Sequence, residues 1–167
     1  MSVLTVMFLI FIVTQRLGEL VIAKRNTAAL MARGAEEHAA GHYPFMVLLH
    51  TCWLAALILG GYDKEVSLVW LGIFAVLQLF RVWILTTLGE RWTTRIIVLN
   101  EPLVLAGPFK YFRHPNYMLV VAEIFVAPMV LGLWDIAVIF SILNAAMLYV
   151  RIREEEKALA HLRHERH

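Results

Sequence analysis

Two short polar runs in the sequence carry residue types that could bind and orient a small molecule. The first is Gly107-Pro-Phe-Lys-Tyr-Phe-Arg-His-Pro-Asn-Tyr117. Its Gly107-Pro108 pair predicts a turn, and Pro115 is well placed at the start of a helix. The backbone N–H groups of a helix N-terminus suit a ligand carboxylate, and the aromatic side chains could stack on a heteroaromatic ring or a cation. The plainer interpretation is a turn that enters a membrane helix.

The second run is Arg151-Ile-Arg-Glu-Glu-Glu-Lys-Ala-Leu159. Arg151 and Glu155 are four residues apart and therefore share one face of a helix. This pattern predicts a charged face that could bind a polar ligand. The plainer interpretation is the charged end of a helix.

The composition indicates a membrane protein. Of the 167 residues, 60% are hydrophobic and 17% are charged, and the mean hydropathy is +0.70. Soluble domains are roughly 45–50% apolar, so a soluble globule of this composition would expose large apolar patches and associate. The single cysteine, Cys52, excludes an internal disulfide and a Cys-x-x-Cys site. A net charge of +2 does not favour nucleic acid as a partner.

Apolar segments of suitable length predict an all-α integral membrane protein, because a spanning helix needs about 20 residues. We expect one domain over residues 1–167, with residues 151–167 continuing the last helix. The sequence predicts about five transmembrane helices, at residues 2–23, 43–60, 66–88, 117–133 and 135–150.

The basic residues predict the orientation of these helices. They follow the first, third and fifth segments, whereas the opposite side carries only Lys64. The positive-inside rule then places the N-terminus outside and the C-terminus in the cytoplasm, in what we expect to be a bacterial inner membrane. Segment 89–116 exceeds the usual 2–8 residues of a bundle connection. We expect it to form a folded cytoplasmic layer that binds a cofactor.

Several polar residues interrupt the apolar segments, where ionisable groups are costly and usually face a protein interior or a wet cavity. Arg16 and Glu19 are three residues apart and can pair with each other, and Arg81 can extend to the interface. Glu123 has apolar neighbours on both sides, so we expect it to line a cavity shared with Arg81 or Arg16. His50 fits either a core histidine or a ligand contact. The full set is Gln15, Arg16, Glu19, His50, Gln78, Arg81, Glu123 and Asn144.

No metal site is expected. His38, His42 and His50 lack a carboxylate or cysteine in metalloprotease order. The remaining histidines near the end of the chain are expected to be solvated; they are His161, His164 and His167.

Together, the two polar runs resemble a known family. Arg113-His-Pro-Asn-Tyr117, followed after two short helices by Arg151-x-x-x-Glu155-Glu156-x-x-Leu159, is similar to the isoprenylcysteine carboxyl methyltransferases, which are membrane S-adenosylmethionine-dependent enzymes. The resemblance extends back through Gly107 to Leu88-Gly89 and covers about half the chain.

The N-terminal half is similar to the bacterial branch of that family. The matching motifs are Arg33-Gly34-Ala35-Glu36, His42-Tyr43-Pro44 and then His50. Members of this branch methylate alkylpyrones or alkylresorcinols, so the resemblance implies an acceptor of that kind.

The resemblance implies S-adenosylmethionine as the cofactor. In the family, the His-Pro-x-Tyr run, the backbone about a dozen residues upstream of it and a carboxylate in the second run contact the cofactor. Phe109 stands where the family often has tyrosine, which preserves stacking but removes any hydroxyl hydrogen bond. The implied cofactor-binding residues are Glu101, Pro102, Leu103, Val104, Phe109, His114, Pro115, Asn116, Tyr117 and Glu155.

The resemblance also places Arg151 at the methyl acceptor. Glu156 completes the motif. A phenolic acceptor would need a general base, for which Glu123 and Glu156 are the candidates. Arg81 and His50 are candidate acceptor contacts. We therefore assign candidate catalytic roles to Arg151, Glu123 and Glu156, and candidate substrate contacts to Arg151, Arg81 and His50.

We expect a membrane O-methyltransferase that acts on the polar head of a lipophilic acceptor. A long-chain alkylpyrone or alkylresorcinol is the first choice and a prenylcysteine carboxylate the second. Two other classes stay open: a small transporter, for which inverted repeats would be expected and none is evident, and a membrane scaffold that recruits a partner through its charged tail. The sequence leaves the oligomeric state open.

Overall fold

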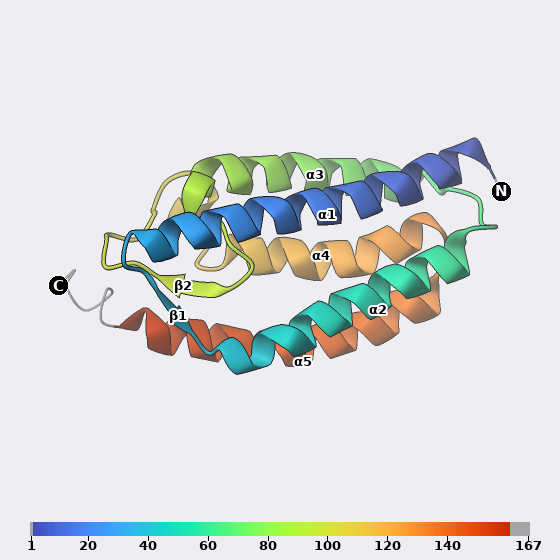
Figure 1. Cartoon of the computed structure of the whole chain (residues 1–167). Coiled ribbons are helices and arrows are strands. Elements are labelled where there is room, and N and C mark those ends of the chain that lie inside the picture. Colours follow the sequence, from blue (N-terminus) through green and yellow to red (C-terminus); the bar gives the residue numbers. More distant parts are fainter. Residues whose placement is uncertain (1, 161–167) are drawn as a thin grey trace.

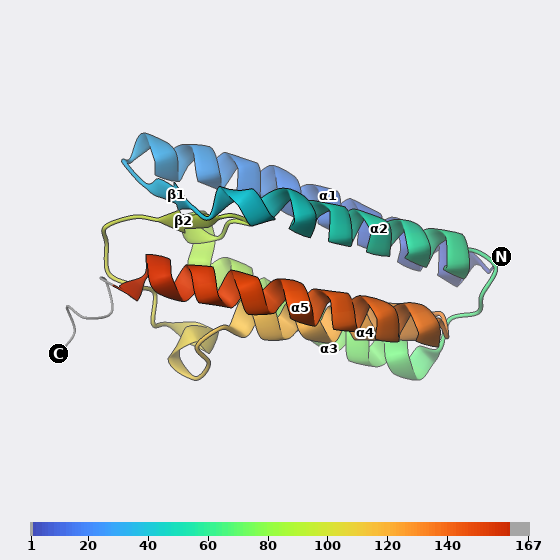
Figure 2. The same cartoon turned by 90° about the horizontal axis from the view of Figure 1, so that it is seen from below.

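The computed structural model describes residues 2–160, in which five long helices lie side by side along one axis (Figure 1). Figure 2 shows that α1 and α2 form one layer, whereas α3, α4 and α5 form the other. The helices are α1 (Val3–Ala32), α2 (Tyr43–Gly61), α3 (Leu68–Leu88), α4 (Pro115–Val130) and α5 (Trp134–Ala158).

The helices indicate an integral membrane protein. Within the described residues, four stretches are long and apolar enough to cross a bilayer: Val3–Ala32, Ala40–Gly61, Leu68–Arg91 and Trp134–Ala158. The remaining apolar helix, α4, has 16 residues, fewer than the roughly 20 that a span needs. The helical membrane fold is as expected, whereas a span count of five stays a prediction.

The end of α4 differs from the predicted boundary because a glycine turn closes the helix early. Gly132 has a φ of 67°, and the Leu133 N–H donates to the Pro128 carbonyl at 3.0 Å. This is the Schellman arrangement that commonly ends helices. As a result, α4 stops at Val130, three residues before the predicted end at Leu133.

Helix α1 also departs from prediction, because it continues nine residues past Ala23 to Ala32. The extra turns are held by a buried face, on which Ala23, Asn26 and Leu30 recur at helical spacing. The Asn26 amide donates to the carbonyls of Gly89 and Trp92 at 3.1 and 2.8 Å. The polar end of α1 is therefore helical because it packs on the 89–116 segment.

The connections of the bundle lie at opposite ends. The start of α1, the α2–α3 link and the α4–α5 turn share one end, and residues 33–42, 89–114 and the last turns of α5 share the other (Figures 1 and 2). We call the second the site end. It also holds three short 3-10 turns: η1 (Ala40–His42), η2 (Gly89–Arg91) and η3 (Gly107–Lys110).

A two-stranded sheet at the site end was not predicted. β1 (Glu36–His38) pairs antiparallel with β2 (Ile96–Val98), so that Glu37 lies opposite Ile97. Ile96 and Val98 are buried, and Ala158 of α5 belongs to the same cluster. The sheet therefore joins the α1–α2 connection to the 89–116 segment and to α5.

A cluster of ion pairs fills the interior of the bundle. Glu123 is fully buried, and its carboxylate accepts hydrogen bonds from Arg16 (2.8 Å), Arg81 (2.9 Å) and Gln78 (3.0 Å). Glu19 accepts from both arginines, at 3.1 Å from Arg16 and 2.8 Å from Arg81. Two arginines and two glutamates thus neutralise one another across α1, α3 and α4. We call these four residues the charge cluster.

Candidate functional site

A cavity of about 520 Å³ lies at the site end of the bundle. Its size falls in the range of roughly 300–1,000 Å³ that is usual for small-molecule sites. The walls come from β2, the 99–113 loop, the start of α4, the last turns of α5 and Leu30 of α1. The two polar sequence runs therefore meet in one cavity.

The start of α4 supplies one side of this cavity. Pro115 is the first helical residue, as its fixed φ and missing N–H favour. His114 is the N-cap residue, and its side chain makes no capping hydrogen bond. Its ring instead stacks on Tyr117, with centroids 5.5 Å apart. The N-terminal turn of α4 thus presents His114 and Tyr117 together to α5.

The last turns of α5 face this pair with two carboxylates. His114 Nδ1 lies 3.7 Å from Glu155 Oε1, and Nε2 lies 3.5 Å from Glu156 Oε1. The Tyr117 hydroxyl donates a hydrogen bond to Glu155. Glu155 therefore contacts both His114 and Tyr117 of the first sequence run.

Arg151 is held from three directions one turn before Glu155. Its Nε donates to the Tyr117 hydroxyl at 2.9 Å, and one terminal nitrogen donates to the Thr94 carbonyl at 2.6 Å. The other terminal nitrogen lies 2.7 Å from the Met46 sulfur of α2. Arg151 is 5% exposed. Its guanidinium is thus fixed in position rather than free to follow a ligand.

Glu101 is fixed at the edge of the cavity by two arginines. Arg33 donates to its carboxylate at 2.6 Å, and Arg91 donates both to the same carboxylate and, at 2.5 Å, to the Pro102 carbonyl. The hydrogen bond from Arg33, with further support from Arg91, lowers the pKa of Glu101 below its ordinary value. The end of α1 thereby ties down the loop that forms the cavity wall.

Most of the residues expected to bind the cofactor line this one cavity. Nine of the ten do so, and so does Arg151. Pro102 is not part of the lining, and its carbonyl is instead bonded to Arg91. Glu156 also lies outside the lining and pairs with His114 and with Arg113, the latter at 3.4 Å.

Three other candidates lie elsewhere. Glu123 and Arg81 belong to the charge cluster, and neither lines the cavity. Glu123 contacts Arg81 and Arg16 directly, at 2.9 and 2.8 Å, and a cavity shared among them stays a prediction. The His50 ring donates a hydrogen bond from Nδ1 to the Met46 carbonyl of its own helix at 2.9 Å, and His50 is also absent from the lining. We therefore leave these three residues out of the site.

The structure adds lining residues that the sequence reasoning missed. Trp92 and strand β2 form an apolar wall, and Leu30 reaches the cavity from α1. The β-branched run Ile96-Ile97-Val98 was a signal for a strand. The contacts of Arg151 with Met46 and Thr94 had no local signal, because they join residues far apart in the sequence.

A pH dependence follows from the contacts of His114. The hydrogen bond to Glu155, the charge of Glu155 and contact with Glu156 raise the pKa of His114 above 6.5, with burial opposing the shift. This stabilisation is fully present below the unfolded pKa of about 6.5 and is lost as the pH rises through the higher folded pKa. We expect the unfolding temperature in detergent to fall over that interval, and to fall less in His114→Gln. If the unfolding temperature changed with pH in the same way in the wild type and in His114→Gln, the contacts of His114 would not be the cause of the change.

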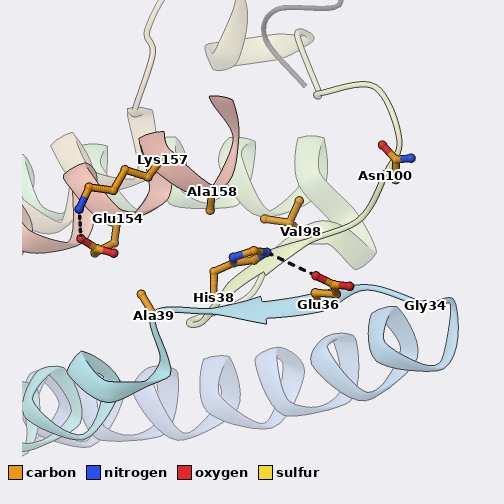
Figure 3. A pocket seen from close by; sticks show the side chains of 9 residues that line it. All are labelled: Gly34, Glu36, His38, Ala39, Val98, Asn100, Glu154, Lys157 and Ala158. Carbon is orange, nitrogen blue, oxygen red and sulfur yellow. Dashed lines mark hydrogen bonds and ion pairs between the residues drawn. The ribbon is translucent and has the colours of Figure 1, made fainter. Parts of the chain in front are cut away.

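A second cavity of about 470 Å³ lies beside β2, between β1 and the end of α5 (Figure 3). Its polar side chains lie in pairs: His38 lies 4.0 Å from Glu36, and Lys157 lies 2.7 Å from Glu154. None of the expected site residues lines it. We therefore assign the site to the first cavity.

Comparisons with known proteins relate the chain to one family. The sequence model of the isoprenylcysteine carboxyl methyltransferase (ICMT) family matches residues 70–161, more than half of the chain. The matched region includes the 99–113 loop, α4 and the polar end of α5. No solved structure matches the chain significantly.

Two bacterial relatives match nearly the whole chain. The uncharacterized protein YpbQ of Bacillus subtilis (strain 168) is 38% identical over 154 residues, which cover 89% of this chain and 92% of the relative. An uncharacterized protein of Haemophilus influenzae is 29% identical over 156 residues, covering 88% and 90%. On the extent of the family match, the chain belongs to the isoprenylcysteine carboxyl methyltransferase family.

Proposed function

We propose that this membrane methyltransferase uses S-adenosylmethionine to methylate an oxygen on the polar head of a lipophilic acceptor. The supporting observation is the cluster of His114, Tyr117, Arg151 and Glu155 at the wall of one cavity. Two runs more than thirty residues apart in sequence supply it. A charged helix end and a membrane-entry turn, taken separately, do not account for this convergence.

The cavity offers the partner types that S-adenosylmethionine needs. The carboxylates of Glu101 and Glu155 suit its cationic groups, and the N-terminus of α4 suits its carboxylate. The side chains of Leu103, Val104 and Phe109 form an apolar wall on which the ring of the cofactor would pack. When bound, the cofactor supplies a methyl group on a sulfonium, which is already electrophilic.

The protein's own residues would then mainly position the reactants, since alignment can supply much of the rate of such a transfer. Tyr117 and Thr94 fix Arg151, whose charge is suited to orient an acceptor oxygen. An acceptor oxyanion loses its charge in the reaction, so a contact that bound it too tightly would stabilise the ground state. A fixed and already partnered arginine meets this requirement.

The acceptor we favour is a long-chain alkylpyrone or alkylresorcinol, on the strength of the N-terminal motifs that resemble the bacterial branch. Its alkyl tail would enter from the bilayer. The basic residues at the site end support an orientation with the cavity in the cytoplasm and the N-terminus outside a bacterial inner membrane.

Membrane vesicles of both orientations test function and orientation together. S-adenosylmethionine carrying a labelled methyl group is added outside, with alkylpyrone, alkylresorcinol or prenylcysteine acceptors. We expect transfer in inverted vesicles and none in right-side-out vesicles, with the alkylpyrone or alkylresorcinol preferred. Transfer to prenylcysteine alone would mean that the acceptor is a prenylcysteine carboxylate and not an alkylpyrone or alkylresorcinol. A folded protein that binds no S-adenosylmethionine in detergent would refute the proposed reaction.

A further inference from the structure

The loop Leu105–Arg113, which we call the interfacial loop, projects from the α3–α4 side of the bundle at the site end (Figure 2). It combines apolar and basic side chains that are exposed and that also border the site cavity. Leu105 is 57% exposed and Tyr111 70% exposed, and Phe112 is exposed as well. Lys110 and Arg113 are the basic residues of the loop, and both are exposed.

Contacts with α3 fix the depth of the interfacial loop. Gly107 has a φ of 54°, and a Cβ added there would lie 2.5 Å from the Thr87 hydroxyl and 3.1 Å from Trp83 Nε1. The loop backbone therefore lies against the last turns of a helix that is long and apolar enough to span the bilayer. The outward face of the loop must then lie where the hydrocarbon core gives way to lipid headgroups.

The chemistry of the loop matches that region. Aromatic side chains concentrate at the boundary between membrane and water, and Trp83 beside the loop is itself 44% exposed. Lys110 Nζ lies 5.7 Å from the centroid of the Tyr111 ring, and the Arg113 side chain is 65% exposed. Basic side chains at this depth attract anionic lipids.

We propose that the interfacial loop binds the headgroup of an anionic phospholipid, with Lys110 as the main contact and Tyr111 and Phe112 seated among the acyl chains. The aromatic side chains account for contact with the bilayer, and the charge selects the headgroup. The same loop forms a wall of the cavity. The proposal holds whether or not that cavity binds S-adenosylmethionine.

A local quenching measurement tests this proposal. A bimane label at Tyr111→Cys, in a Cys52→Ser background because Cys52 is exposed, is read in phosphatidylcholine nanodiscs containing a small fraction of brominated lipid. We expect brominated phosphatidylglycerol to quench at about a fivefold lower fraction than brominated phosphatidylcholine, as one basic contact predicts. Labelling at Phe112→Cys keeps the Tyr111 ring in place and should give the same preference.

Two charge variants complete the test. Lys110→Gln should reduce the preference to near unity, whereas Lys24→Gln, an exposed lysine on α1 toward the same end, should leave it unchanged. Equal quenching by the two lipids would overturn the headgroup selectivity. Quenching by neither lipid would show that the loop lies outside the bilayer, which would overturn the whole proposal.

Discussion

Glu155→Gln is expected to weaken the binding of S-adenosylmethionine by at least tenfold. The substitution keeps the size of the side chain and an oxygen that can accept from Tyr117, but it removes the negative charge. Hydrogen bonds to a charged group contribute about 1.5–3 kcal/mol, and about 1.4 kcal/mol corresponds to a factor of ten in affinity. Calorimetric titration of the purified protein in detergent measures the change.

The matched control is Glu154→Gln, one residue earlier on α5. It makes the same change in charge, but Glu154 pairs with Lys157 and does not line the site cavity. We expect wild-type affinity from this variant. Equal affinities in both variants and the wild type, all monodisperse, would remove Glu155 from the site.

Glu123→Ala is expected to cost about 3–5 kcal/mol of unfolding free energy, the usual effect of removing one partner from a buried ion pair. Position 123 is fully buried. Without its carboxylate, Arg16 and Arg81 share one remaining carboxylate of the charge cluster, that of Glu19. Since whole domains are stable by only about 5–15 kcal/mol, little folded protein should survive mild heating in detergent. Unfolding curves in one detergent, compared with those of the wild type, measure the loss.

The double variant Glu123→Leu with Arg81→Leu tests whether the lost stability comes from the unpaired buried charge or from any substitution at position 123. It removes one charge of each sign and leaves Arg16 paired with Glu19. Replacing a buried pair by apolar residues is often neutral or stabilising, so we expect the double variant to be clearly more stable than Glu123→Ala.

Glu65→Ala, at an exposed position, should change stability by no more than about 0.5 kcal/mol. If Glu123→Ala matched the wild type, the charge cluster would have no role in stability.

The sequence was informative where local pattern decides the outcome. Apolar runs located the helices, and Pro115, a favourable residue for a helix start, begins α4 two residues before the predicted boundary at residue 117. The spacing of Arg151 and Glu155 placed both on one face, and the structure puts both at the cavity. These features depend on helix periodicity and on the fixed φ of proline, which are properties of a few neighbouring residues.

Features that depend on long-range packing were not predictable in this way. The extension of α1 to Ala32 depends on the bonds of Asn26 with a segment more than sixty residues away. Glu123 was expected at a cavity because a buried carboxylate needs partners. Arg16 and Arg81 supply those partners directly, and a one-dimensional pattern does not show whether water or protein fills the space between helices.

The charge cluster has a consequence for how the chain enters the membrane during synthesis. Arg16 and Glu19 lie on the same helix, so α1 carries its own counter-charge. Arg81 on α3 instead pairs with Glu123 on the next helix, α4. A lone charge at the centre of an inserting helix costs roughly 2.5–3.5 kcal/mol. We expect this cost to be lower if α3 and α4, which are consecutive in the chain, enter the lipid together as a neutral pair.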